Sequence, residues 1–373
     1  MRTAGSERVA RLSAALPERE IDVLLVHTPI SVRYLTGFTG SNSLVLVTAE
    51  GAEDRAGGHR FLTDFRYATQ SAAQVSAPFE LQVVSGELLD AAARLLLSAP
   101  AGGGRLGFDD ASLTVAQHRR LCELLAPAWR PVPCAGAVER LRAIKDSGEI
   151  ARIRAAAELA DRALARVLEQ GLVGRTERDV AIELELEMRR LGADGPSFPS
   201  IVASGAHGAL PHAEPRDTPI PRDVLVTIDW GALHEGYCSD CTRTYATGER
   251  LAAQAREVYE LVLRAQATAL VAVRAGPSGR ELDAIARAII ETAGHGEHFG
   301  HGLGHGVGME IHEGPRLSRT AGEEPLRAGN VVTVEPGVYL PGECGVRIED
   351  LVVLHADGHE VLTGLSKQLT VIS

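Results

Sequence analysis

Three histidines stand among alternating glycines between Phe299 and His312, in the order Phe-Gly-His-Gly-Leu-Gly-His-Gly-Val-Gly-Met-Glu-Ile-His. They are His301, His305 and His312. Because glycine permits sharp turns and close packing of the backbone, such a segment can aim several imidazoles into one pocket. A flexible Gly-rich loop with solvated histidines would have the same residue types, and a short motif needs a structural context before it indicates chemistry. The interpretation therefore depends on which other groups could meet these histidines.

One pair of carboxylates that could meet them lies in residues 223–246. Asp229 ends a strongly apolar run, and Asp240 follows after the next turn. A hairpin centred on His234 and Glu235 would place the two acids directly opposite each other on one face of a sheet. An acid taken alone is usually solvated. At the end of an apolar strand, however, a carboxylate is costly unless it is paired or binds a metal.

A second pair of carboxylates repeats this arrangement. Glu335 ends the apolar run 331–334 and Glu349 lies on the returning strand, so a turn around Gly342 would set these two acids opposite each other. Four acids in one cleft repel one another strongly unless a cation lies among them. Four carboxylates and one imidazole match a site for two divalent ions, and manganese, cobalt, iron or zinc would suit such ligands.

Cys238 and Cys241 form a C-x-x-C motif around Asp240, which raises a redox site or a structural zinc site as an alternative. The motif has no partner C-x-x-C and falls on an expected strand. A closed structural zinc site would use thiolates as its ligands. We interpret the two thiols as a coincidence beside Asp240.

The composition limits the class of protein. The chain has 373 residues, of which 45% are hydrophobic and 23% charged, as in a soluble globular protein with room for two domains. The net charge of -11 argues against nucleic-acid binding, which needs a basic face. Five scattered cysteines suit a reducing compartment. There is neither a signal-peptide pattern nor a run near the ~20 apolar residues of a membrane span, so we expect a cytoplasmic protein with no membrane partner.

Strands alternate with helices in the first third of the chain, which predicts an α/β domain over residues 1–136. A Pro- and Gly-rich interruption at 131–136 marks its end. The isolated histidines at 27, 59 and 118 do not indicate a catalytic cluster. Strands are expected at 21–26, 43–48, 60–63, 79–84 and 105–108, and helices at 6–20, 65–76, 87–98 and 113–126.

The remaining residues, 137–373, repeat one order of elements. The segment Gly174–Ala181 is echoed by Gly279–Ala286. The repeat predicts an α+β domain whose two similar halves face each other across a shared cleft. The first copy has expected helices at 147–170 and 176–191 and strands at 200–204, 223–230 and 237–246, and the second has helices at 253–274 and 279–293 and strands at 330–335 and 346–354.

Five motifs in this order resemble those of the aminopeptidase P and prolidase branch of the pita-bread metallopeptidases, most closely the small bacterial aminopeptidases P. Two N-terminal segments, 34–41 and 63–67, resemble the creatinase-like N-terminal domain of that branch, so the likeness covers nearly the whole chain. It implies a creatinase-like α/β domain, a pita-bread domain with pseudo-twofold halves, and a homodimer. The motifs are Ile228-Asp-Trp-Gly-Ala232, Tyr237-Cys-Ser-Asp-Cys-Thr-Arg-Thr244, Gly300-His-Gly-Leu-Gly-His-Gly-Val-Gly308, Glu335-Pro-Gly-Val-Tyr339 and Val346-Arg-Ile-Glu-Asp350.

The resemblance implies two divalent metal ions, with Mn2+ as the first candidate and Co2+ or Zn2+ as alternatives. All positions of the family's ligand set carry the expected residue. These ligands are Asp229, Asp240, His305, Glu335 and Glu349.

The resemblance also implies a mechanism in which water attacks the carbonyl of the bond that precedes proline. Glu335 is the expected general base, and His312 and His212 are expected to donate hydrogen bonds to the developing oxyanion. His301 and Arg347 would shape the pocket for the proline ring. The additional histidine at 207 is not part of the motif, and we expect it to be solvated.

The expected activity is that of an Xaa-Pro aminopeptidase, which removes the first residue of a peptide with proline in second position. The nearest alternative is prolidase, which cuts only Xaa-Pro dipeptides and must bind their carboxylate. Arg316 resembles a prolidase feature that could do so. Methionine aminopeptidase is disfavoured by the additional N-terminal domain and creatinase by the intact metal ligands. A catalytically inactive binding protein on this fold is the alternative from another class.

Overall fold

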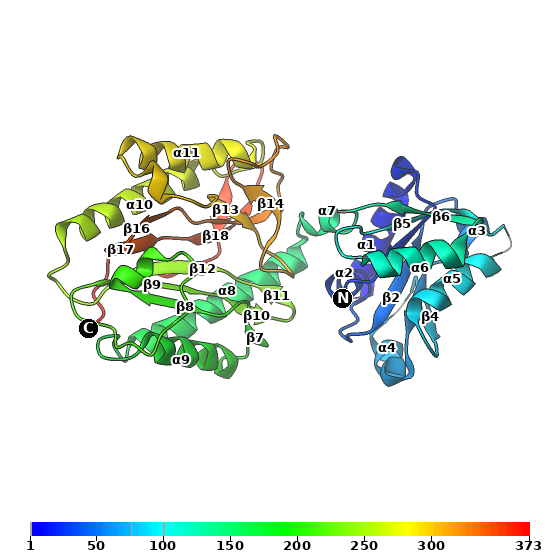
Figure 1. Cartoon of the computed structure of the whole chain (residues 1–373), viewed down its shortest axis with the longest axis horizontal. Helices are drawn as coiled ribbons and strands as arrows, with labels where there is room; N and C mark the ends of the chain where they lie inside the picture. The colour runs from blue at the N-terminus through cyan, green and yellow to red at the C-terminus, as the bar shows by residue number, and fades with distance from the viewer. Residues whose placement is uncertain (1, 76, 100) are drawn as a thin grey trace. The chain divides into compact units, whose positions relative to one another are not determined.

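The computed structural model describes residues 2–75, 77–99 and 101–373, and the chain divides into two compact units, Met1–Arg142 and Ala143–Ser373 (Figure 1). The domain boundary expected between residues 136 and 137 stays a prediction. Within the described residues, every helix is too short or too polar to cross a membrane.

The first unit contains a six-stranded mixed sheet in the order β4-β3-β2-β1-β5-β6, and each expected strand is present. Helix α1 ends just before Pro17, which cannot continue it, so it is shorter than expected at its C-terminal end. Three elements were missed in the sequence, α2, α3 and β6. The strands are β1 (Val23–Val26), β2 (Ser43–Thr48), β3 (Arg60–Thr63), β4 (Glu80–Val83), β5 (Gly104–Phe108) and β6 (Trp129–Pro133); the helices are α1 (Arg2–Ala15), α2 (Pro29–Thr36), α3 (Glu53–Ala56), α4 (Ala68–Gln74), α5 (Leu88–Ser98), α6 (Val115–Leu125) and α7 (Glu139–Arg142).

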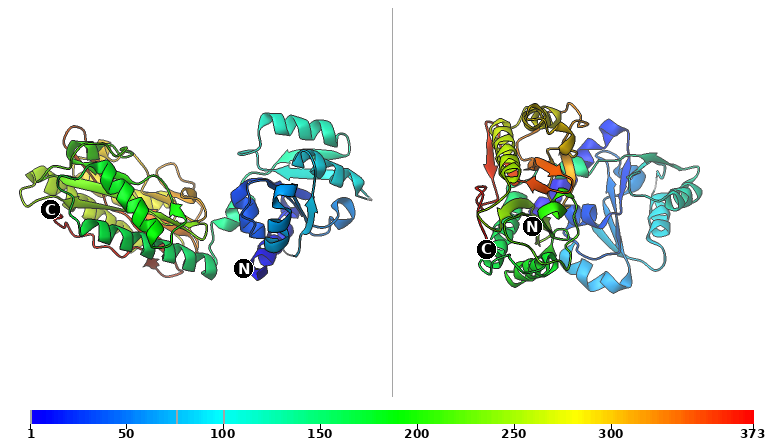
Figure 2. Two further views of the ribbon diagram at one scale, coloured as in Figure 1. Left: turned by 90° about the horizontal axis from the view of Figure 1, so that it is seen from below. Right: turned by 60° about the vertical axis from the view of Figure 1, so that its left-hand side comes forward.

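The second unit consists of two similar halves, as expected. In the first half, α8 (Ser147–Leu168) and α9 (Glu177–Arg190) accompany a sheet of β8 (Ile201–Ser204), β9 (Leu225–Trp230) and β12 (Cys241–Ala246). The strands lie toward the middle of the unit and the helices on its outside (Figures 1 and 2). Buried side chains of these helices and strands, Leu164, Val180 and Trp230 among them, form one core.

The second half has the same plan. Helices α10 (Ala253–Ala272) and α11 (Gly279–Thr292) lie on the opposite side of the unit from α8 and α9 (Figure 1). Val262, Leu282 and Val352 belong to its core. Its sheet has the order β14-β13-β15-β18-β19, and β16 and β17 form a separate ribbon; the bounds are β13 (Gly304–Gly306), β14 (Glu313–Leu317), β15 (Val331–Val334), β16 (Gly337–Leu340), β17 (Cys344–Arg347), β18 (Asp350–Leu354) and β19 (His359–Val361).

The N-caps of α9 and α11 show how the two halves correspond. Thr176 accepts a hydrogen bond from the third residue of α9, and Ser278 does the same for α11. Each cap residue also forms an isolated β-bridge with a proline, Thr176 with Pro219 and Ser278 with Pro325. Equivalent positions are therefore set by the caps, and the alignment that paired the segments beginning at Gly174 and Gly279 is wrong by three residues.

Candidate metal centre and active site

The first pair of acids lies on one hairpin, but in a different register from the expected one. Glu235 and Gly236 both have positive φ, 49° and 82°, which is the requirement of a two-residue type I′ turn. The hairpin is therefore centred on these two residues, and Asp229 pairs with Thr242. The expectation that Asp240 stands directly opposite Asp229 is wrong. Asp240 lies two positions before Thr242, diagonally across the hairpin from Asp229.

The second pair of acids follows the expected register. Val334 pairs with Asp350 at the end of β15, and Gly337 pairs with Arg347 at the start of β16. Between these pairs, the same register sets Glu335 opposite Glu349. Gly342 has φ of 81° in the turn that closes the ribbon, so the predicted arrangement around this glycine is confirmed.

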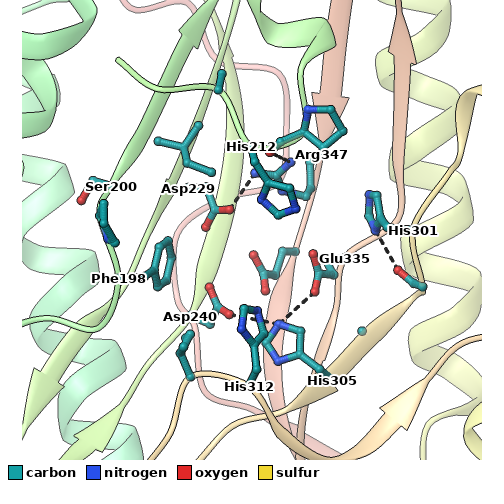
Figure 3. A pocket seen from close by; sticks show the side chains of 18 of the residues that line it. Phe198, Ser200, His212, Asp229, Asp240, His301, His305, His312, Glu335 and Arg347 are labelled. Atoms are coloured by element: carbon teal, nitrogen blue, oxygen red, sulfur yellow. Dashed lines mark hydrogen bonds and ion pairs between the residues drawn. The ribbon is translucent and has the colours of Figure 1, made fainter. Parts of the chain in front are cut away.

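The two hairpins bring the acids into one pocket of about 490 Å³, where they face one another (Figure 3). Asp229, Asp240 and Glu349 each offer a carboxylate oxygen within 4.8 Å of the others. His305 Nε2 lies 3.3 Å from an oxygen of Glu335 and 3.5 Å from one of Asp240. All five predicted metal ligands and the predicted side chains at 212, 301, 312 and 347 line this pocket.

Electrostatic repulsion within the cluster is visible in the pKa values of its acids. Burial, followed by the charge of neighbouring acids, raises the pKa of Asp240 and Glu349 well above the usual range. Burial also raises the pKa of Asp229, although Arg347 offsets part of that effect. Burial is the largest effect on Glu335 and acts in the same direction, but the hydrogen bond with His305 and the charges of His305, His301 and Arg347 together outweigh it and lower the pKa of Glu335 to about 2.

Two carboxylate oxygens of the acid cluster are buried and have no hydrogen-bond partner among the described residues. They are Oδ1 of Asp229 and Oε1 of Glu349. A buried oxygen without a donor loses its hydration and gains nothing in exchange. Divalent ions would provide the missing partner for both oxygens and would neutralise the acids around them. The donor set of four carboxylates and one imidazole therefore fits two such ions.

Arg347 holds the acid cluster in place through hydrogen bonds from its guanidinium group. Its guanidinium donates to Asp229 at 2.6 Å, to the Tyr339 hydroxyl at 2.8 Å, to Thr242 at 3.0 Å and to the carbonyl of Pro211 at 3.2 Å. Thr242 in turn donates to Glu349 at 2.7 Å. Thr242 and Tyr339 were not assigned roles from the sequence, although both lie inside quoted motifs; only the tertiary contacts give them a function.

The histidines differ in their surroundings. His301 is held by the Tyr339 hydroxyl at Nε2, 2.9 Å away, and by the carbonyl of Gly302 at Nδ1, 2.8 Å away. Burial lowers the pKa of His301 and also that of His312, so neutral rings that can donate one hydrogen bond are favoured. His312 packs edge-on against His305 with ring centroids 4.3 Å apart.

Two sequence predictions fall outside this pocket. Arg316 is exposed on β14, where it pairs in register with His305, and is not one of the described residues that line the pocket. His207 was expected to be solvated, which is wrong: its side chain is only 7% exposed, and Nδ1 lies 2.8 Å from a carboxylate oxygen of Glu177. The partner lies thirty positions earlier in the chain, so no local pattern reveals it.

The two thiols of the C-x-x-C motif are buried on the first hairpin. Cys238 Sγ contacts the carbonyl of Met309 at 3.8 Å, and Cys241 Sγ contacts the carbonyl of Glu349 at 3.6 Å. These contacts pack the strand beside the acid cluster and leave the thiols apart from the pocket lining.

Comparison with known proteins gives matches over both units. Residues 151–356 match the model of metallopeptidase family M24, and residues 8–144 match that of the creatinase/prolidase N-terminal domain. The uncharacterized peptidase YqhT of Bacillus subtilis is 42% identical over 352 residues, which are 94% of this chain and 96% of that protein.

Solved structures of similar proteins match the fold of this chain over nearly its whole length. An Xaa-Pro dipeptidase from Bacillus anthracis is 39% identical with a TM-score of 0.92, covering 98% of this chain and 99% of its own. An X-Pro aminopeptidase from Thermotoga maritima is 36% identical with a TM-score of 0.86, covering 98% of this chain and 100% of its own.

Proposed function

The chain belongs to metallopeptidase family M24. We propose that it is an Xaa-Pro aminopeptidase that depends on two divalent metal ions, with Mn2+ as the first candidate. It hydrolyses the bond between an N-terminal residue and a proline in second position. The observation that carries this proposal is the convergence of four buried or half-buried acids and one imidazole, with two carboxylate oxygens that have no donor among the described residues. The ligands would be Asp229, Asp240, His305, Glu335 and Glu349.

Divalent ions in such a site supply a water of lowered pKa and polarise the carbonyl under attack. Glu335 takes the proton of the attacking water and returns it to the leaving proline nitrogen. His312 and His212, which lie at the exposed rim of the pocket, donate hydrogen bonds to the oxyanion that forms. Arg347 holds Asp229 through its 2.6 Å hydrogen bond, so that the free amine of the substrate meets a fixed carboxylate.

Proline in second position suits this pocket for a physical reason. Its ring removes the amide N–H and fixes φ, so the site needs no acceptor for that N–H. The hydroxyl of Tyr339 lies between His301 and Arg347 and is bonded to both. This hydrogen-bonded trio would give the ring a rigid wall.

The exposed rim supports an aminopeptidase, because a chain continuing beyond proline can leave the pocket past His212 and His312. A prolidase is the second candidate, favoured by the exposed guanidinium of Arg316 on the strand beside His305, which could bind the carboxylate of a dipeptide. The homodimer implied by the resemblance and the cytoplasmic location expected from the sequence pattern stay predictions.

Hydrolysis of Ala-Pro, Ala-Pro-Ala and the corresponding tripeptide amide tests the proposal, with Mn2+, Co2+ and Zn2+ supplied in turn. We expect cleavage of the tripeptide and its amide with equal or greater kcat/KM than the dipeptide. A clear preference for Ala-Pro would favour a prolidase over the proposed aminopeptidase, provided that Arg316→Met removes this preference and the control Arg319→Met keeps it. A protein with neither a bound nor an activating ion would instead be an inactive binding protein on this fold.

A further inference from the structure

Outside the acid cluster, one buried carboxylate gathers donors from three separate residues. Glu177 is the first residue of α9 and has 0% of its side chain exposed. Ser204 donates to Oε1 through its N–H at 2.8 Å and its hydroxyl at 2.7 Å. Arg216 donates through its backbone N–H at 3.1 Å and through its guanidinium at 3.2 Å to each oxygen. His207 lies 2.8 Å away at Nδ1.

These donors stand at both ends of one segment, residues 205–216, which we name the His212 loop. Ser204 directly precedes this loop, His207 lies near its start and Arg216 is its last residue, so a single carboxylate ties the two ends together. His212 lies between these ends and lines the active pocket.

The middle of the His212 loop is held by contacts that leave little room for adjustment. A Cβ on Gly345 would lie 1.7 Å from the carbonyl oxygen of Gly208, so the two backbones pack directly against each other. Further along, the carbonyl of Pro211 accepts a hydrogen bond from Arg347 at 3.2 Å. The loop therefore touches the same arginine that fixes Asp229, and a shift at its ends is passed to the pocket.

We propose that Glu177 is a positioning residue for the Xaa-Pro peptidase reaction: by clamping both ends of the His212 loop, it fixes His212 over the acid cluster. The inference rests on the function proposed above. At the first turn of a helix an acid is ordinarily stabilised by exposed backbone N–H groups and solvent. Glu177 is instead fully buried, which is costly for a charge, and its donors come from the loop.

The test is a double-mutant cycle of Glu177→Gln and His212→Ala, assayed on Ala-Pro-Ala with Mn2+. In the glutamine variant an NH2 group replaces one carboxylate oxygen and faces the N–H donors of His207 or Arg216. These hydrogen bonds are then lost, and one end of the loop is released. In the wild-type background we expect kcat and kcat/KM to fall together by about 10- to 100-fold. In the His212→Ala background the same change should cost less than about twofold, because the displaced group is already gone.

Three further measurements separate positioning from general damage to the fold. Calorimetric titration with Mn2+ should give the same affinity for Glu177→Gln and wild type. Hydrogen exchange should rise in residues 205–216 and stay unchanged in β9 and β12. The matched control Glu183→Gln removes a carboxylate on the same helix that pairs with Arg175, and it should leave kcat/KM within about twofold.

Arg216→Met provides a second variant that should fold, because the arginine side chain is 48% exposed, and we expect the same pattern with a smaller loss. Equal losses from Glu177→Gln with and without His212, or unchanged activity in both variants of the clamp, would overturn the inference alone. A wild-type protein that cleaves no Xaa-Pro bond would overturn the proposed function, and the inference with it.

Discussion

Replacing Glu349 with glutamine should stabilise the metal-free protein at neutral pH, although it removes a proposed metal ligand. Glu349 is buried to 1% exposure, and one of its oxygens has no donor. Burial and the charges of Glu335 and Asp229 raise its pKa well above the usual range. A glutamine keeps the size of the side chain and its oxygen for the Thr242 hydroxyl, and its amide can donate to the orphaned oxygen of Asp229.

The sign of the pH dependence follows from the raised pKa. At a pH above the usual pKa of a glutamate, the folded protein keeps the proton of Glu349 and the unfolded chain has lost it. The unfolded chain therefore binds fewer protons, and the free energy of unfolding falls as pH rises. The slope is at most about 1.4 kcal/mol per pH unit for one retained proton, which sets an upper limit of about 2.7 kcal/mol between about pH 5 and pH 7.

Glu349→Gln removes this contribution. We expect the free energy of unfolding of the metal-free variant, relative to metal-free wild type, to increase by up to about 2.7 kcal/mol over the same interval.

The assay is urea denaturation of both proteins between about pH 5 and pH 7, after removal of metal with a chelator, and again with excess Mn2+. With Mn2+ the order should reverse, because wild type binds the ions more tightly and ligand binding adds to its stability. Parallel pH curves for the two metal-free proteins would refute the reasoning, since they would mean that Glu349 is not held in a repulsive, buried cluster.

Two further predictions concern the base and the glycine-rich segment. Glu335→Gln should abolish hydrolysis of Ala-Pro-Ala while its circular dichroism and cooperative unfolding stay those of wild type; measurable turnover would exclude Glu335 as the base. Arg287→Met should lower the free energy of unfolding in urea by about 3–5 kcal/mol, because it leaves Asp283 charged and unpaired in the interior and frees the carbonyls of Phe299 and His301. Adding Asp283→Leu should restore part of this loss, and a double variant no more stable than the single one would contradict that reason.

The strands that are buried on both faces could be predicted in both units, because such burial leaves a plain apolar signature. The run Ser43–Thr48, for example, forms β2 and is buried at every position. Other strands, such as β13, β14 and β19, lack this signature and were not predicted. The strand β6 was missed because its prolines at 131 and 133 read as a linker. An edge strand tolerates them, since β6 pairs with β5 alone and its other side needs no N–H donors.

The residues that form the candidate metal site could be predicted from the sequence, whereas the residues that hold the site in place were harder to predict. The acids and His305 stand out because charged residues interrupt apolar or glycine-rich runs, and that is a local signal. Glu177 and His207 lie in an ordinary helix start and an ordinary loop, and their partnership depends on a fold that joins distant positions. Arg287, buried beneath the glycine-rich segment, is likewise an unremarkable helical arginine in the sequence.

The predicted register of the first hairpin was wrong, and the observed register has a clear electrostatic consequence. In the expected register Asp240 would face Asp229 directly, and two like charges would oppose each other at the closest position of a ladder. The type I′ turn puts Thr242 there instead. Its hydroxyl accepts from Arg347 and donates to Glu349, so one small side chain connects the acids of both hairpins. The positive φ at Glu235 therefore determines which side chain stands opposite Asp229, although that side chain, Thr242, lies seven residues from Glu235 in the chain.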